Sequence, residues 1–282
     1  MKIAILGCGS MGTALLEGFL AADKSAPGDS SWSYSASVRS QASVERVKRA
    51  LGSSSEKAEV VANDQTRLAE QADVTILGCQ SQDLTTLFKV SGLLKALNGK
   101  LVISLLAGES AEQLRKTARE VGGNDIDLHI APVIPSIGCT EQDSVTLVAK
   151  TPSLTEQETG QVKTIFEKIG VVQYFPDSLM NAATAVGAVC HALSIVVNDA
   201  IVDASVAMGI PRDMAVGVTA HSLKSSNNLL AKSMTPESLK QAMSTPNGIT
   251  INAVLNLENA QIRSAVAGSV QKAIQHANAM SG

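Results

Sequence analysis

Lys2-Ile3-Ala4-Ile5-Leu6-Gly7-Cys8-Gly9-Ser10-Met11-Gly12 opens the chain and predicts a strand, a glycine turn and a helix in direct succession. In such a turn Gly7 permits the tight bend, Gly9 lets the backbone approach a pyrophosphate, and Gly12 lets the helix pack closely on the strand. The first helical turn, from Ser10 and Met11, adds free N–H groups and a partial positive charge for an anion. The stretch therefore predicts a dinucleotide site rather than an ordinary glycine-bearing turn.

The part of the chain up to about residue 176 alternates short apolar runs with helical patterns, which is typical of a doubly wound sheet. The expected strands are Lys2–Leu6, Ser33–Val38, Val60–Val61, Val74–Gly78, Leu101–Ser104, Asp127–Ile130, Val145–Val148 and Val171–Tyr174. The expected helices between them are Ala42–Leu51, Gln65–Ala72, Leu84–Leu94, Ala111–Val121 and Thr155–Ile169. We expect Ser25–Ser33 to form an extended surface loop.

Beyond Pro176 the sequence keeps helical periodicity and shows no strand pattern. The expected helices are Ser178–Met208, Arg212–Ala231, a short one that begins at Thr235-Pro236, Ile249–Asn256 and Ala260–Met280. We predict an α/β fold, with a Rossmann-type doubly wound domain over residues 1–176 and an all-α dimerisation domain over residues 177–282. The apolar first helix of the second domain is expected to pack against a second subunit.

Composition limits the partners that we expect. The net charge of −3 argues against nucleic acid, for which a basic face is needed. Four scattered cysteines lack metal-ligand or disulfide spacing, which predicts buried reduced thiols and no metal. The uncharged stretch Ser178–Asn198 is long enough to span a membrane, but its polar residues and alanines favour a helix buried within a soluble assembly. A strand that begins at residue 2 leaves no room for a secretory signal, so we expect a cytoplasmic protein.

The end of the second expected strand indicates which nicotinamide cofactor the site takes. NAD sites commonly carry an acid there for the ribose 2′-hydroxyl, whereas this chain has Arg39 followed by Ser40. A guanidinium pairs bidentately with a 2′-phosphate, and the serine adds a hydroxyl. The alternative is a solvated arginine before the next helix. The missing acid and the arginine together predict NADPH, with NADH possible.

Motifs in order along the whole chain resemble those of pyrroline-5-carboxylate reductases. They are the glycine turn, Val38-Arg39-Ser40, Val102-Ile103-Ser104-Leu105-Leu106-Ala107-Gly108, Met208-Gly209-Ile210-Pro211-Arg212, Thr245-Pro246-Asn247-Gly248-Ile249-Thr250 and Leu257-Glu258-Asn259-Ala260-Gln261-Ile262-Arg263-Ser264. The resemblance implies hydride transfer from NAD(P)H to the C=N carbon of a cyclic imino acid, giving proline. It also implies a homodimer, or a larger ring of dimers, built through the helical domain.

The resemblance assigns further residues to the site. Thr245, Asn247, Gly248 and Thr250 match the family's turn that holds the substrate carboxylate, and hydroxyls at a helix N-terminus suit that anion independently of the family. Cys79, Gln80, Ala107 and Gly108 are implied to contact the cofactor. A cyclic imine needs little acid–base help, so we expect no catalytic triad. The catalytic candidates are Thr250, which bonds the substrate, and His191, a possible proton donor whose alternative is a buried core residue.

Three segments depart from the family pattern. Cys79-Gln80-Ser81 replaces Val-Lys-Pro, Ala131-Pro132-Val133-Ile134-Pro135 replaces Met-Pro-Asn-Thr-Pro, and Ala188–Leu193 replaces Gly-Ser-Gly-Pro-Ala-Tyr. These changes predict a more apolar and bulkier substrate pocket. The substrate is then pyrroline-5-carboxylate or a related, carboxylated cyclic imine of a specialised pathway.

Two other functions fit the same domain plan. A non-redox protein of this fold would bind or cyclise a metabolite. A β-hydroxyacid dehydrogenase would place a catalytic lysine on the long interdomain helix, and Ser178–Met208 contains none.

Overall fold

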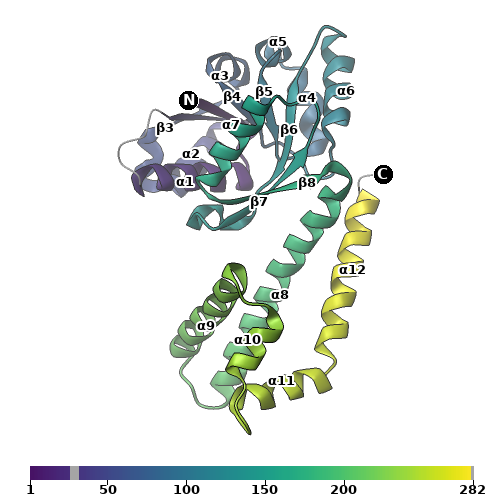
Figure 1. Ribbon diagram of the computed structural model, residues 1–282. Coiled ribbons are helices and arrows are strands. Elements are labelled where there is room, and N and C mark those ends of the chain that lie inside the picture. The colour runs from purple at the N-terminus through teal and green to yellow at the C-terminus, as the bar shows by residue number, and fades with distance from the viewer. Residues whose placement is uncertain (26–31, 281–282) are drawn as a thin grey trace. The chain divides into compact units, whose positions relative to one another are not determined.

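The computed structural model describes residues 1–25 and 32–280, so most of the loop expected at Ser25–Ser33 lies outside the described residues. Eight strands form one sheet in the order β3-β2-β1-β4-β5-β6-β7-β8 (Figure 1). They are β1 (Lys2–Leu6), β2 (Ser33–Val38), β3 (Ala58–Ala62), β4 (Val74–Leu77), β5 (Leu101–Ser104), β6 (His129–Ile134), β7 (Ser144–Lys150) and β8 (Gly170–Pro176). Neighbouring strands are parallel except β6 and β7.

The central strand β1 explains why the sheet is covered on both faces. It pairs in parallel with β2 on one side and with β4 on the other. Ile3 and Ile5 belong to one hydrophobic cluster, and Ala4 and Leu6 belong to the other, because successive side chains of a strand point to opposite faces. Both faces are therefore buried, as parallel sheets require.

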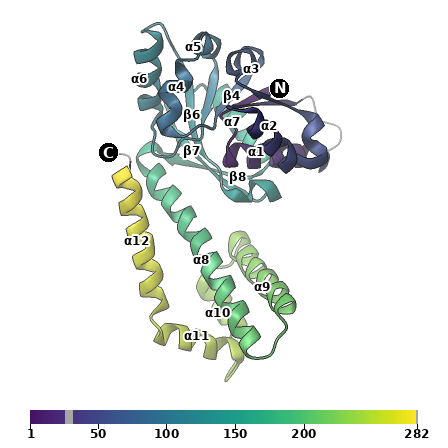
Figure 2. The same cartoon turned by 180° about the vertical axis from the view of Figure 1, so that it is seen from behind.

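Different helices cover the two faces (Figures 1 and 2). Helices α1 (Ser10–Ser25), α2 (Gln41–Leu51) and α7 (Glu156–Glu167) contribute to the cluster that contains Ile3 and Ile5. Helices α3 (Gln65–Gln71), α4 (Leu84–Phe88), α5 (Leu93–Leu97) and α6 (Ala111–Gly122) contribute to the cluster that contains Ala4 and Leu6. The predicted Rossmann-type doubly wound sheet is confirmed.

Most expected elements are found with ends that differ by a few residues, and two differ by more than that. The helix predicted over Leu84–Leu94 is wrong, because the chain forms two short helices, α4 and α5, with Gly92 at φ 78° between them. A residue in that left-handed conformation ends helical geometry, and glycine adopts it without steric cost. The strand expected over Asp127–Ile130 instead runs to Ile134, so β6 contains most of the segment Ala131–Pro135.

The second part of the chain is helical. Its elements are α8 (Met180–Ala207), α9 (Arg212–Lys232), α10 (Pro236–Met243), α11 (Ile249–Asn259) and α12 (Ile262–Met280). The contacts divide the chain into one compact unit of Met1–Thr184 with the residues from Asn278, and another of Ala185–Ala277. We call these the Rossmann unit and the helical unit. The domain boundary predicted after residue 176 stays a prediction, because the division of the contacts falls inside α8.

The helical unit buries few of its own side chains. Among its described residues, the buried ones are Ala185, Val202, Ala215 and Thr219. Large apolar side chains are exposed instead, with Ile195 at 70% and Ile249 at 92% of their full surface. Asp177–Ala207 is long and apolar enough to cross a membrane by length and composition alone, with a mean hydropathy of 1.8 and 11% of its most apolar window buried. Within one chain the long helix is thus largely uncovered.

Candidate functional site

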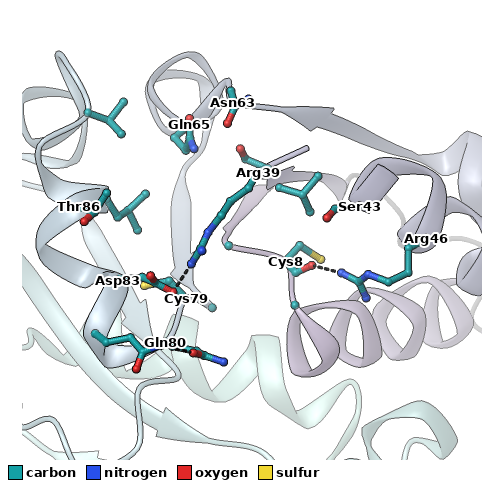
Figure 3. A pocket seen from close by; sticks show the side chains of 18 residues that line it. Cys8, Arg39, Ser43, Arg46, Asn63, Gln65, Cys79, Gln80, Asp83 and Thr86 are labelled. Atoms are coloured by element: carbon teal, nitrogen blue, oxygen red, sulfur yellow. Dashed lines mark hydrogen bonds and ion pairs between the residues drawn. The ribbon is translucent and has the colours of Figure 1, made fainter. Parts of the chain in front are cut away.

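A pocket of about 640 Å³ opens at the carboxyl ends of β1, β2 and β4 (Figure 3). The strand order reverses at β1, and in open α/β sheets ligands bind at such a switch point. The lining comes from the turns that follow the three strands and from the helices beyond them. It comprises Gly7, Cys8, Gly9, Ser37, Val38, Arg39, Ser43, Arg46, Asn63, Gln65, Gly78, Cys79, Gln80, Gln82, Asp83, Thr86, Leu87 and Val90.

The glycine turn is built as its sequence predicts. Gly7 has φ 80°, and a Cβ there would lie 2.8 Å from the backbone nitrogen of Cys79. A Cβ on Gly12 would lie 3.2 Å from Cγ2 of Ile5, so the absence of a side chain lets α1 pack on β1. Gly9 differs, because the nearest atom to a Cβ there is 3.9 Å away. The open space beside Gly9 leaves its backbone accessible to a ligand.

Helix α1 points its N-terminus into this turn. The N–H of Gly7 and that of Cys8 both donate to the carbonyl of Ser37 at 3.0 Å, and the N–H of Thr13 donates to the carbonyl of Gly9 at 2.9 Å. The N–H groups of the first helical turn, those of Ser10, Met11 and Gly12, have no intrahelical acceptors in any α-helix. These three donors and the helix dipole therefore suit a phosphate.

Two arginines bring positive charge to the same pocket. Arg39 follows β2 and reaches across the pocket to the carboxylate of Asp83 (Figure 3). Arg46, on α2, donates from Nη2 to the carbonyl of Cys8 at 3.1 Å. The hydroxyl of Ser40 caps α2 by accepting from the N–H of Ser43 at 3.2 Å. The Arg39–Asp83 pair joins residues 44 positions apart.

The described residues fit a dinucleotide that carries phosphates. The glycine turn leaves room beside Gly9, and the pocket holds two guanidinium groups against the one carboxylate of Asp83. Ser37 also lines the pocket, and its carbonyl accepts the N–H groups of Gly7 and Cys8, which fixes the glycine turn beside the ligand space.

A smaller pocket of about 210 Å³ lies farther along the sheet, at the ends of β5 and β6. Its lining includes Gly108, Pro132 and Ile134, and Met180 from the start of α8. Our expectation that both branched residues of the Ala131–Pro135 segment would enlarge an apolar wall is half wrong. Ile134 lines this pocket, whereas Val133 is fully buried in the core on the other face of β6, since neighbours in a strand alternate.

Only some of the predicted cofactor residues line the large pocket. Gly7, Gly9, Arg39, Cys79 and Gln80 line the large pocket, and Gly108 lines the small one. Ser10, Met11 and Gly12 form the first turn of α1, and Ser40 is a helix cap. Ala107 is exposed between β5 and α6. Sequence analysis missed other lining residues, and those with polar side chains are Ser37, Ser43, Arg46, Asn63, Gln65, Gln82, Asp83 and Thr86.

The turn before α11 contains the predicted carboxylate-binding residues. Gly248 is the N-cap of α11, and its N–H donates to the carbonyl of Thr245 at 2.9 Å. A Cβ on Gly248 would lie 2.4 Å from the Thr245 hydroxyl, and Asn247 has φ 55°. Among the described residues, neither the Thr245 nor the Thr250 hydroxyl has a recorded hydrogen-bond partner. The turn therefore presents two hydroxyls and first-turn N–H groups, which together suit an anion.

His191 and the cysteines differ in part from expectation. His191 and its neighbour Cys190 on α8 are exposed in the single chain, so His191 is not a core residue of this chain. Cys8 and Cys139 are buried, and Cys79 is half-buried. Burial raises the pKa of the Cys8, Cys79 and Cys139 thiols to about 11, which keeps them protonated at neutral pH.

Comparison with known proteins covers the whole chain. A family model described as pyrroline-5-carboxylate reductase dimerisation matches residues 177–280, and one described as NADP oxidoreductase coenzyme F420-dependent matches residues 2–108. The chain is 31% identical over 310 residues to the pyrroline-5-carboxylate reductase of Neurospora crassa, with 100% of this chain and 93% of the relative covered. It is 30% identical over 292 residues to the pyrroline-5-carboxylate reductase of Lophium arboricola, with 97% and 91% covered.

A solved structure shares the fold over the same length. The crystal structure of Plasmodium falciparum pyrroline carboxylate reductase with NADP bound superimposes with a TM-score of 0.81 at 20% identity, and covers 100% of this chain and 98% of its own. The glycine turn, the helical unit and the full-length relatives all indicate the same family. This chain belongs to the pyrroline-5-carboxylate reductase family.

Proposed function

We propose that this protein is an NADPH-dependent reductase of a cyclic imine, either pyrroline-5-carboxylate or a carboxylated relative of it. Reduced nicotinamide supplies a hydride to the imine carbon, and the nitrogen takes a proton. The observation that carries the proposal is the pocket at the switch point, where Arg39 and the N-terminus of α1 face one ligand space. A chain of this family with such a pocket has what phosphorylated coenzyme binding requires.

Within the Rossmann unit we assign roles by charge and backbone geometry. The α1 N-terminus and the backbone of Gly9 receive the pyrophosphate, and Arg39 receives the 2′-phosphate of NADPH. The turns after β4 and β5, with Cys79, Gln80, Ala107 and Gly108, then lie along the remainder of the coenzyme toward the smaller pocket. NADH is the expected weaker coenzyme, because it lacks the phosphate that Arg39 binds.

The helical unit contributes the substrate residues. We infer that the Thr245 and Thr250 hydroxyls and the Gly248 N–H bind the substrate carboxylate, with Asn247 shaping the turn. His191, exposed on α8, is the proton donor that we propose for the imine nitrogen. No metal and no nucleophile enter this assignment, since hydride transfer depends chiefly on orientation and exclusion of water.

We also propose that the protein acts in the cytoplasm as a homodimer, or as a ring of dimers, without nucleic acid or membrane. The support is the net charge of −3 and the exposed apolar side chains of the helical unit, which a second copy would cover. A detergent-free dimer in solution is the expected result of light scattering.

The direct test of the activity follows NADPH absorbance with purified enzyme and synthetic pyrroline-5-carboxylate. Turnover that requires both reagents and yields proline supports the proposal. A second series replaces the substrate with imines that have a larger ring or a larger substituent. The reason is that Ile134 lines the small pocket at a position where the family has a polar residue. Tight NADPH binding without turnover of any cyclic imine would instead favour a non-redox binding protein.

A further inference from the structure

The ion pair between Arg39 and Asp83 crosses the large pocket and joins two of its walls (Figure 3). Nη2 of Arg39, at the end of β2, donates to Oδ2 of Asp83, in the turn Ser81–Asp83 that follows β4. The Asp83 side chain is 26% exposed and that of Arg39 is 73% exposed. The guanidinium that a 2′-phosphate needs is thus held by a carboxylate of the same site.

Local structure gives no reason for a charged side chain at position 83. The residue precedes α4, yet its side chain makes no capping hydrogen bond to that helix. Its backbone N–H donates to the carbonyl of Gln80 at 2.9 Å, which any residue except proline would do at this position. The partner recorded for the carboxylate is Arg39.

Two coenzymes would meet this pair differently. The 2′-phosphate of NADPH must draw Arg39 away from Asp83, and the phosphate and the carboxylate repel each other at short range. The 2′-hydroxyl of NADH is a donor, and a carboxylate accepts such a hydroxyl in sites where an acid follows the second strand. Asp83 therefore opposes one coenzyme and suits the other.

We propose that Asp83 is a coenzyme-selectivity residue, which competes with the 2′-phosphate of NADPH for Arg39 and accepts the ribose hydroxyl of NADH. The inference rests on the proposed function, because it presumes that a nicotinamide dinucleotide occupies the pocket. With Asp83 in this role, the protein should prefer NADPH over NADH less strongly than it would with Arg39 and no carboxylate partner. The remaining cation, Arg46, is bound to the carbonyl of Cys8 and is not in this competition.

The test is the dissociation constant of each coenzyme, measured by calorimetry without substrate on the full-length protein. Asp83→Asn keeps the size of the side chain and removes its charge. Loss of an exposed ion pair shifts an equilibrium by up to about fivefold, and loss of the acceptor for NADH acts in the same direction on the ratio. We expect the ratio of the NADH constant to the NADPH constant to rise about fivefold or more.

Two further variants keep the result interpretable. Glu112→Gln makes a similar carboxylate-to-amide change at an exposed glutamate that pairs with Arg115 on α6, and the ratio should stay at the wild-type value. In an Arg39→Ala background the competition for the guanidinium is gone, while the repulsion of the 2′-phosphate and the bond to the NADH hydroxyl remain, so Asp83→Asn should change the ratio by a smaller factor than in the wild type. An unchanged or lower ratio in Asp83→Asn, or an equal effect in both backgrounds, overturns the inference. Wild-type protein that binds neither coenzyme would instead refute the proposed function.

Discussion

The space around Gly7 differs from the space around Gly9, so Gly7→Ala and Gly9→Ala should have opposite effects. The first should lower the stability of the protein, and the second should weaken coenzyme binding. At Gly7 an alanine must adopt φ 80°, which costs about 1–2 kcal/mol. Its Cβ would also lie 2.8 Å from the Cys79 nitrogen and 2.9 Å from the Cys79 Cα, both backbone atoms of a neighbouring turn. Overpacking of this kind costs a further ~1–3 kcal/mol, so we expect the free energy of unfolding to fall by about 2–5 kcal/mol.

At Gly9 the expectation is reversed. Its φ lies outside the left-handed region, and the nearest atom to a Cβ is 3.9 Å away, so the folded protein should lose no more than about 0.5 kcal/mol. The methyl group would instead occupy the space through which a pyrophosphate approaches the backbone. We expect the NADPH dissociation constant to rise tenfold or more, which is about 1.4 kcal/mol of binding free energy.

The assay uses the single tryptophan of the chain, Trp32, which belongs to the Rossmann unit. Urea unfolding followed by its fluorescence gives the stability of each variant, and calorimetry gives coenzyme binding. Equal stability of Gly7→Ala and Gly9→Ala would refute the steric reasoning. Wild-type NADPH affinity in Gly9→Ala would refute the position assigned to the pyrophosphate.

Four further outcomes are expected. Arg39→Ala should weaken NADPH binding at least about tenfold, because a hydrogen bond to a charged group is worth ~1.5–3 kcal/mol. NADH binding should stay within about twofold of wild type. Equal losses of affinity for both coenzymes in titrations would remove Arg39 from the cofactor site. Thr250→Val should raise KM for a carboxylated imine about tenfold without changing NADPH affinity; steady-state kinetics with an unchanged KM would place the carboxylate elsewhere. Burial alone would raise the pKa of Glu158, but hydrogen bonds from the Thr155 N–H and from His129 hold that pKa below its ordinary value of 4.5. Glu158→Gln keeps an acceptor for the capping box but loses the charge at the N-terminus of α7, so it should cost about 0.3–1 kcal/mol at neutral pH. Melts should show the difference vanish as pH falls through the folded pKa of Glu158. Ile195→Asp should yield monomers in light scattering, and an unchanged dimer would show that Ile195 lies outside the interface.

Much of the Rossmann unit could be predicted because its signals are local. The glycine turn after the first strand is determined by neighbouring residues, and β1, β2 and β5 have the bounds that the sequence predicts. The break between α4 and α5 was missed although Gly92 was visible, since a glycine inside an apolar helical pattern does not always stop a helix. Pro132 was misleading in the opposite sense, because proline is uncommon inside strands, yet β6 runs through it.

The candidate site was less predictable because it depends on pairs that are distant in sequence. Arg39 was identified from its place after a strand, but nothing near it in sequence indicated that Asp83 would be its partner. Arg46 and Thr86 reach the pocket from helices whose rotation is fixed only by packing on the sheet. Val133 points into the core and Ile134 toward the small pocket because the segment is a strand, and the sequence analysis ended the expected strand at Ile130.

The scarcity of buried side chains in the helical unit links folding to protein concentration. In a single chain both faces of the sheet are buried, whereas Ile195 and Ile249 are exposed to water. A second copy that packs on the helical unit would cover such apolar surface. Mass action then stabilises the assembled state, and the melting temperature should climb when the sample is concentrated and drop on dilution. In a cell, newly made chains without a companion would be the ones that chaperones and proteases encounter.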